Sequence, residues 1–203
     1  MSNIKIYVEG GGNSNNLHAR CREGFKKLLE NSGLKGRVPR IVACGSRNEA
    51  FDSFKTAQEK ENLQYVALLV DSEDPVKDIE QTWKHLKDRD RWECPQDATD
   101  DQVFLMTTCM ETWIITDRTA LGKIYRNCLQ TSALPSIVKN VIEQRSRQEI
   151  QDALIRATQK CTNAYAKNKH SFQALANVDP NTLQQHLPSF ARMIRVLDQR
   201  LPE

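Results

Sequence analysis

Short apolar runs and amphipathic segments alternate along the first half of the chain. Residues 4–8 (IKIYV) and 65–70 (YVALLV) are rich in β-branched, aromatic and aliphatic side chains, which favour strands. The second run is apolar throughout, which is typical of a strand buried on both faces of a parallel sheet. Two shorter runs, residues 41–43 and 103–108, predict two more strands.

Between these strands, apolar residues recur at helical spacing. Residues 16–31 predict an amphipathic helix that closes at Gly33, because glycine ends helices readily. Ser46 and Glu49 have the spacing of a capping box and predict the start of a second helix. A third helix is predicted through residues 79–83. This order of elements predicts an α/β fold with a doubly wound, mostly parallel sheet.

The later part of the chain shows helical patterns only. Met110–Thr116 has the pattern of a helix start, and Ser146 forms another capping box with Glu149. The pair Asp179-Pro180 is typical of a helix start with proline in the first turn. A final amphipathic helix is predicted over residues 190–201. The sequence therefore predicts a C-terminal helical extension of the sheet domain.

Charge divides the chain in two. Residues 1–117 carry 16 Lys and Arg against 20 Asp and Glu, a net charge of −4, whereas residues 118–203 carry 13 against 6, a net charge of +7. We interpret these as an α/β metal-binding domain and a basic helical subdomain that packs on the sheet or covers it as a lid. A basic region beside an acidic one suits a polyanionic substrate. On charge alone, a basic face that is merely solvated is the commoner explanation.

The composition is that of an ordinary soluble globular protein, with 39% hydrophobic and 27% charged residues. No stretch approaches the roughly 18 apolar residues of a membrane helix, and the N-terminus lacks a signal-peptide pattern, so we expect a cytoplasmic protein. The six cysteines are widely spaced, with neither a C-x-x-C pair nor the spacing of a zinc site. We expect them to be reduced and mostly buried.

Acidic residues follow the predicted strands. Glu9 follows the first strand, Asp71, Glu73 and Asp74 follow the third, and Glu111 lies in the helix after the fourth. Ligands of open α/β sheets bind beyond the carboxyl ends of the strands, so these carboxylates converge if the first and third strands are neighbours. Crowded carboxylates repel one another, and Mg²⁺, which prefers carboxylate oxygens, relieves that repulsion. The pattern therefore predicts a metal site with Mg²⁺ or Mn²⁺ as cofactor.

Each acidic residue also has a plainer interpretation. A single carboxylate at a strand end is usually a helix cap or a turn residue, and Asp74-Pro75 fits that description. Glu9 is either a metal ligand or a general base. Glu111 is either a further ligand, as in two-metal nucleases, or a structural residue beside Trp113 in the core.

Several residues are candidates for binding phosphate. The glycine run after Glu9 allows close approach of a phosphate to the backbone, although it lacks the third glycine of a dinucleotide fingerprint and a Walker lysine. Basic side chains in the first helix and near residue 170 are further candidates, with solvated surface charge as the alternative. His18 and His85 have no apparent partner. The full set of phosphate-binding candidates is Gly10, Gly11, Asn13, Arg20, Lys167, Lys169 and His170.

The acidic pattern resembles that of Toprim domains. Glu9-Gly10 after the first strand and Asp71-x-Glu73 after the third are similar to the Toprim glutamate and its D-x-D-type pair. Toprim domains occur in primases, topoisomerases and overcoming-lysogenization-defect-type nucleases, where the acidic set binds Mg²⁺ for phosphodiester chemistry. The third acidic position is Glu73 rather than Asp, which leaves open whether Glu73 or Asp74 is the ligand.

Nearly the whole chain also resembles a Toprim-like family of bacterial proteins of unknown function, often encoded beside an ABC/AAA-type ATPase in anti-phage defence operons. The resemblance implies a nuclease effector controlled by an ATPase partner, with tRNA, other RNA or DNA as substrate. It leaves the trigger and the oligomeric state open, a homo-oligomer included. The segments that carry it are Tyr7-Val8-Glu9-Gly10, Leu69-Val70-Asp71, Met110-Glu111-Thr112-Trp113, Lys169-His170-Ser171-Phe172 and Pro188-Ser189-Phe190.

Three functions compete at this point. The first is a Mg²⁺-dependent nuclease that uses Glu9, Asp71, Glu73 and Glu111. The second is a non-catalytic module that binds a partner ATPase or nucleic acid, and the substitution at Glu73 motivates it. The third is a phosphotransfer receiver or a phosphatase, since both place acidic pockets at strand ends. The single acidic residue after the first strand and the lack of a fifth strand ending in lysine speak against a receiver.

Overall fold

The computed structural model describes residues 4–60, 64–139, 141–167 and 170–202. Lys169, one of the phosphate-binding candidates, lies outside these residues. The strands are β1 (Ile4–Gly11), β2 (Arg40–Gly45), β3 (Tyr65–Asp71) and β4 (Val103–Met106). The α-helices are α1 (Asn15–Leu29), α2 (Arg47–Lys60), α3 (Thr82–Asp90), α4 (Met110–Thr116), α5 (Arg118–Tyr125), α6 (Arg147–Thr158), α7 (Ser171–Leu175), α8 (Pro180–His186) and α9 (Pro188–Arg200).

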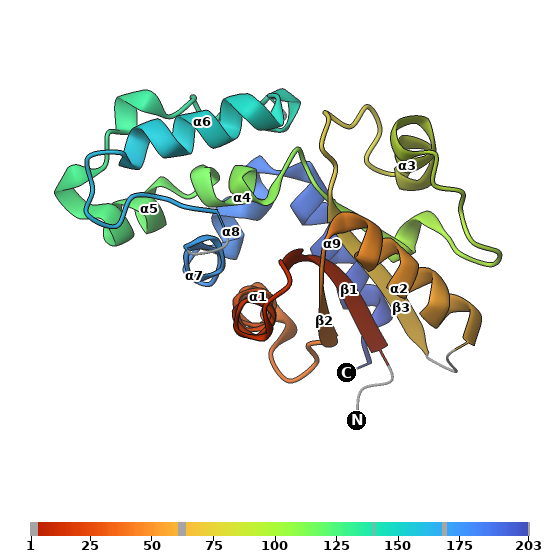
Figure 1. The fold of residues 1–203 in the computed structure, drawn as a ribbon. Coiled ribbons are helices and arrows are strands. Elements are labelled where there is room, and N and C mark those ends of the chain that lie inside the picture. The colour runs from red at the N-terminus through yellow and green to blue at the C-terminus, as the bar shows by residue number, and fades with distance from the viewer. Residues whose placement is uncertain (1–3, 61–63, 140, 168–169, 203) are drawn as a thin grey trace.

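The four strands form one parallel sheet in the order β2-β1-β3-β4. Val8 at the centre of the sheet pairs with Ala43 of β2 on one side and with Leu69 of β3 on the other. β1 lies between β2 and β3 (Figure 1), and β4 forms the edge of the sheet beyond β3. Helices cover both faces, so the prediction of a doubly wound α/β fold is confirmed.

Strand residues alternate between two hydrophobic cores. Ile6, Leu69 and Met106 belong to a large core shared with α1, α4 and α9, whereas Leu68 and Leu105 belong to a smaller core with α2 and α3. This alternation follows from the pleat of a strand, which sends successive side chains to opposite faces. β3 is buried along its whole length, as its uninterrupted apolar run predicts.

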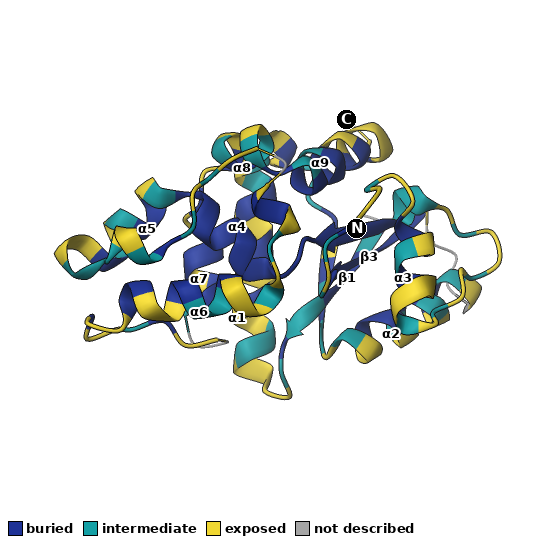
Figure 2. Ribbon diagram, turned by 90° about the horizontal axis from the view of Figure 1, so that it is seen from above, coloured by how far each residue is buried: buried dark blue, intermediate teal, exposed yellow. Residues whose placement is uncertain are grey.

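Helix α4 lies at the centre of the C-terminal half, where it packs against α5, α6, α7 and α8 (Figure 2). The ring of Trp113 packs edge-on against Phe190 of α9, with ring centroids 4.9 Å apart. α9 returns to the sheet, where Arg192 donates hydrogen bonds to the carbonyls of Val103 and Asp100. The large core thus extends from Ile4 in β1 into α9, while the division of the chain at residue 117 stays a prediction. Among the helices that the structure describes, none has the length and apolar character of a membrane span.

Element boundaries differ from the prediction at several places. β1 includes Glu9 and runs on to Gly11 rather than ending at Val8, because Gly10 and Gly11 still pair with Gly45 of β2. The third helix begins at Thr82 rather than before Ile79, because the Asp100 carboxylate accepts hydrogen bonds from the Thr82 hydroxyl and the Trp83 amide and fixes the helix start there. β4 ends at Met106 rather than at residue 108. The predicted helix over 16–31 becomes α1 with a wider final turn, and Gly33, with φ of 91°, closes it as expected.

The expectation that all six cysteines are reduced is wrong for two of them. Cys128 and Cys161 form a disulfide bond, with their Cα atoms 5.3 Å apart. The tertiary structure brings them together because the turn after α5 packs on the end of α6, where the Gln130 amide donates to the Ala157 carbonyl. The four others are free; Cys21 and Cys109 are buried, Cys44 is half-buried and Cys94 is exposed.

Candidate functional site

The candidate site lies where the strand order reverses. From β1 the chain crosses to β2 on one side of the sheet, and from β2 it crosses over β1 to reach β3 on the other side. The loops that leave neighbouring β1 and β3 therefore diverge to opposite faces, and open α/β sheets bind their ligands beyond the strand ends at such a position. Glu9 lies near the end of β1 and Asp71 is the last residue of β3.

Three carboxylates meet beyond these strand ends, as the sequence predicts. One oxygen each of Glu9, Asp71 and Glu73 lies within 4.8 Å of the other two, and we call these residues the carboxylate cluster. Glu73 has a φ of 67°, and its amide donates to the Thr108 carbonyl, which turns the chain after β3. Asp74 instead forms an ion pair with Arg89 at 3.0 Å and is mostly exposed. Of the two residues that the sequence left open, Glu73 is the one in the cluster.

Asp71 is held from three sides. Its carboxylate accepts a hydrogen bond of 2.8 Å from the Met110 amide at the start of α4. Its own amide donates to the Glu9 carboxylate at 3.0 Å, and its carbonyl accepts from Nε of Arg47 at 2.9 Å. Arg47 is fixed in turn by Asp90, at 2.6 Å, and by the ring of Trp92 beneath its guanidinium. The position of Asp71 is therefore built into the fold rather than left to a mobile side chain.

The electrostatics of the cluster favour a bound cation. Burial raises the pKa of Asp71 well above its usual range, and the nearby charges of Glu9 and Glu111 raise it further. Burial also raises the pKa of Glu9, against the lowering effect of its hydrogen bond from Asp71 and of nearby basic side chains. Arg147 and Lys167 lower both pKa values but do not reverse the balance. Carboxylates arranged in this way are stabilised in their charged form by a divalent cation.

The sequence did not indicate two arginines, Arg147 and Arg89, whose guanidinium groups lie against the carboxylates of the cluster. The guanidinium of Arg147 pairs with one oxygen of Glu73 and lies 3.9 Å from the Asp71 carboxylate. Arg89 lies 3.7 Å from the other oxygen of Glu73 and also pairs with Asp74. The N-cap residue Ser146 places Arg147 in the first turn of α6, but nothing in the sequence indicates that this turn faces β3.

Glu111 lies beside the cluster but outside it. The side chain is fully buried at the start of α4 and accepts hydrogen bonds from the Tyr165 hydroxyl at 2.7 Å and from Nε2 of Gln151 at 3.3 Å. Its charge nevertheless contributes to the raised pKa of Asp71. Both interpretations from the sequence thus remain open, since Glu111 is near enough to influence the site and is also anchored in the core.

The basic candidates separate into two groups. Lys167 is exposed, and its charge acts on both Glu9 and Asp71. His170 accepts a hydrogen bond at Nδ1 from the Ala166 amide and lines a different hollow, of about 340 Å³. Arg20 lines a third hollow, of about 420 Å³, between α1 and α7. In the described ranges, neither His170 nor Arg20 has a hydrogen bond or ion pair with the carboxylate cluster.

The glycine run beside Glu9 has a packing role. Gly10 and Gly11 have φ of 137° and 93°, which L-side chains rarely adopt. A Cβ on Gly11 would lie 2.6 Å from Cδ2 of His18, and a Cβ on Gly10 would lie 3.1 Å from the ring of Phe172. His18, which appeared isolated in the sequence, donates from Nε2 to the Gly12 carbonyl at 2.6 Å. The expectation that Gly10, Gly11 and the exposed Asn13 bind phosphate stays a prediction.

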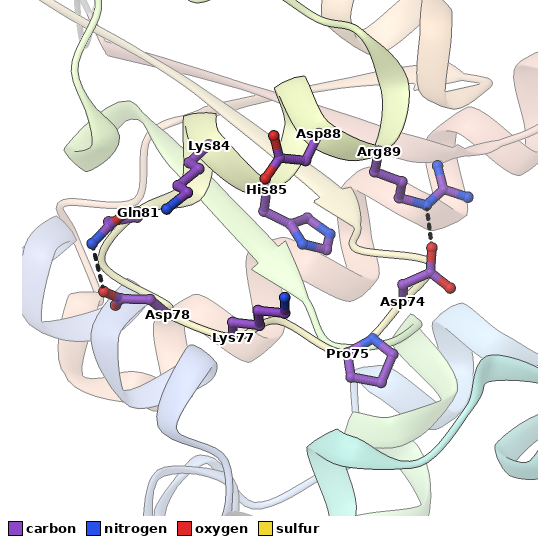
Figure 3. A pocket seen from close by; sticks show the side chains of 9 residues that line it. All are labelled: Asp74, Pro75, Lys77, Asp78, Gln81, Lys84, His85, Asp88 and Arg89. Atoms are coloured by element: carbon purple, nitrogen blue, oxygen red, sulfur yellow. Dashed lines mark hydrogen bonds and ion pairs between the residues drawn. The ribbon is translucent and has the colours of Figure 1, made fainter.

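A cavity of about 400 Å³ opens next to the cluster (Figure 3). It lies between the segment after β3 and helix α3, and Arg89 connects it to Glu73. His85, the other histidine without an apparent partner, points into it and donates from Nε2 to the Ser72 carbonyl. Three basic and three acidic side chains line the cavity, so charge alone selects neither anions nor cations. The lining is Asp74, Pro75, Lys77, Asp78, Gln81, Lys84, His85, Asp88 and Arg89.

Comparison with known protein families places most of the chain in a family. The model of a family described as "Domain of unknown function (DUF4276)" matches residues 8–198, which include every member of the carboxylate cluster and both arginines that contact it. No curated protein matches the chain, and no solved structure does.

Proposed function

The chain belongs to the DUF4276 family, whose function is unknown, and we propose that it is a Mg²⁺-dependent nuclease that cleaves nucleic-acid phosphodiester bonds. The proposal rests on one observation: carboxylate oxygens of Glu9, Asp71 and Glu73 lie within 4.8 Å of one another where the strand order of the sheet reverses. The resemblance to Toprim nucleases supports the choice of reaction.

The residues of the cluster fit a small hard cation. All three ligand atoms are carboxylate oxygens, which suit Mg²⁺ and Mn²⁺, and a site with few protein ligands leaves room for water and a substrate phosphate. When bound, such an ion polarises the phosphoryl oxygen and lowers the pKa of a bound water. Asp71 and Glu73 would hold the ion from one strand end. Glu9, on the neighbouring strand, would complete the ligand set or accept the proton of the attacking water.

Positive charge near the cluster suits the substrate. Arg147 and Lys167 come from the basic C-terminal part, and both act on the carboxylates electrostatically. They therefore stand where a polyanion approaching the cluster needs cations. An ATPase partner and a role in anti-phage defence belong to this proposal through the resemblance, and a cytoplasmic location belongs to it through the sequence pattern of the N-terminus. In the cytoplasm the Cys128–Cys161 bond would be exposed to cellular reductants.

One observation favours a second function, a non-catalytic module that binds a partner ATPase or nucleic acid. Arg147 and Arg89 already pair with Glu73 and so partly neutralise the acidic site, while Glu111 already accepts hydrogen bonds from Tyr165 and Gln151. A module of this kind would bind its partner equally well after Glu9→Ala. It would lose binding when charges of the basic C-terminal part are reversed.

Cleavage assays separate the two functions. Labelled tRNA, single-stranded RNA and plasmid DNA are incubated with the protein in Mg²⁺ or Mn²⁺, with and without the ATPase encoded beside it. We expect cutting by the wild type and by Asp74→Asn, the matched acidic residue outside the cluster, and none by Glu9→Gln. Equal activity of wild type and Glu9→Gln would refute the proposed site. A folded protein that cuts nothing under any condition would favour the binding module.

A further inference from the structure

Of the two arginines that pair with Glu73, only Arg147 lacks an ion-pair partner outside the cluster among the described residues. Its two ion-pair partners are Glu73 and, at 3.9 Å, Asp71. Arg89 also contacts Glu73, but it keeps Asp74 and Asp90 as further partners. A divalent ion held by Asp71 and Glu73 would therefore leave Arg89 paired and deprive Arg147 of all its partners in the described part of the chain.

The backbone of Arg147 is held beside the cluster by contacts that do not involve its side chain. Arg147 is the first residue of α6, and Ser146 caps that helix by accepting a hydrogen bond from the Glu149 amide. The Thr108 hydroxyl, on the segment that follows β4, donates to the Arg145 carbonyl at 3.1 Å. The start of α6 is thus tied to the loop that lies against Glu73. The Arg147 side chain is itself about one quarter exposed, which leaves it free to turn.

We propose that Arg147 exchanges Glu73 for a phosphate of the nucleic-acid substrate when a divalent cation occupies the cluster. This inference rests on the proposed function and assigns a substrate-binding role to a residue of the C-terminal part. A guanidinium suits the role because it binds two phosphate oxygens at once through its planar fork. When no ion is bound, the guanidinium of Arg147 pairs with the Glu73 carboxylate. When Arg147 is removed, the ion no longer competes with it for that carboxylate.

The exchange predicts opposite effects of one substitution on two ligands. The Arg147→Met variant should bind the metal ion more tightly than wild type, because no Arg147–Glu73 ion pair has to break when the ion binds. The same variant should bind oligonucleotide more weakly, but only when divalent cation is present. Arg156→Met is the matched control, since it removes the same charge from an exposed position farther along α6. Arg147→Lys keeps the charge without the fork and should lie between wild type and Arg147→Met in both assays.

Calorimetric titration with Mn²⁺ at pH 8 tests the first effect without any cleavage. We expect Arg147→Met to bind Mn²⁺ about fivefold more tightly than wild type, as for loss of a partly exposed ion pair, with Arg156→Met unchanged and Glu9→Gln greatly weakened. If wild type bound no Mn²⁺, the proposed function and this inference would both fail. If wild type bound Mn²⁺ through Glu9 but Arg147→Met bound it no more tightly, only the exchange would be overturned.

Fluorescence anisotropy with labelled 12-nucleotide single-stranded RNA and DNA tests the second effect. In Ca²⁺, which occupies oxygen sites and is used here to hold the strand uncut, we expect Arg147→Met to bind about tenfold more weakly than wild type and Arg156→Met. In EDTA the three proteins should bind alike, because Arg147 is then held by Glu73. An equal loss for Arg147→Met in Ca²⁺ and in EDTA would contradict the exchange, as would no loss in Ca²⁺.

Discussion

The crowding of charge around Asp71 leads to a prediction that separates function from stability. Asp71→Asn removes one charge from the cluster, and the remaining side-chain oxygen still accepts the hydrogen bond from the Met110 amide. If the site exists to hold a cation, this substitution should stabilise the metal-free protein while it abolishes metal binding. If Asp71 instead serves to cap α4, the same substitution should destabilise the protein.

The expected magnitude follows from the distances. At an effective dielectric constant of about 20, two carboxylates 4.8 Å apart repel by about 3.5 kcal/mol, and Asp71 has two such neighbours, Glu9 and Glu73. Attraction to Arg147 at 3.9 Å offsets about 4 kcal/mol, which leaves a net penalty of about 3 kcal/mol. Lys167 and partial protonation reduce that penalty. We expect Asp71→Asn to raise the free energy of unfolding by about 1–2 kcal/mol at pH 8 in EDTA.

Urea unfolding followed by tryptophan fluorescence measures this difference. Addition of Mg²⁺ at ten times its dissociation constant should stabilise the wild type by about 1.4 kcal/mol and leave Asp71→Asn unchanged. Asp74→Asn is the matched control, and its stability should stay within about 0.5 kcal/mol of wild type because its ion pair is exposed. Loss of more than about 1 kcal/mol by Asp71→Asn in EDTA would refute the argument from crowded charge.

Three further predictions concern stability. Burial raises the pKa of Glu143 from 4.5 to about 7, so the stability that its protonated form provides should be present below about pH 4.5 and lost as the pH rises through 7. In Glu143→Gln, the fall in the free energy of unfolding between pH 5 and 8 should be smaller by up to about 3 kcal/mol, as measured by urea unfolding at each pH. The same fall in the variant and the wild type would contradict the prediction. Replacing Cys128 and Cys161 with serine opens a closed loop that spans 33 positions. The free energy of unfolding should then fall by about 3 kcal/mol, dithiothreitol should do the same to the wild type, and a protein indifferent to both changes would argue against the bond. Gly11→Ala should cost about 2 kcal/mol more than Gly36→Ala, because both have positive φ but only Gly11 would bring a Cβ against a neighbour; equal melting temperatures would refute the clash.

Local patterns in the sequence determined where the strands and helices lie and which polar residues stand at their ends. The apolar run before Asp71 specifies a buried strand because each of its residues faces one of the two cores. The capping box at Ser46 forms with both of its hydrogen bonds, whereas at Ser146 the serine hydroxyl accepts the Glu149 amide but the Glu149 carboxylate pairs with Arg145. Glu9 and Asp71 were identifiable because parallel strands share a carboxyl edge, where ligands gather.

Only the tertiary structure decided which of these residues meet. The strand order makes β1 and β3 neighbours and so brings Glu9 to Asp71, whereas the sequence could state this only as a condition. Glu73 rather than Asp74 enters the cluster because the backbone takes a left-handed conformation at Glu73, which no periodicity reports. Arg147 escaped sequence reasoning altogether, since its partners lie on a distant strand end.

The cysteines show the same limit. Cys128 and Cys161 lie far apart in the sequence and have no motif spacing, yet the turn after α5 packs on the end of α6 and joins them. Hydrophobic periodicity and capping depend on residues within one or two helical turns, so the sequence determines them locally. Ion pairs, the disulfide and the cluster depend on the packing of whole elements against one another. Their positions are fixed only when the sheet order and the helix contacts are fixed.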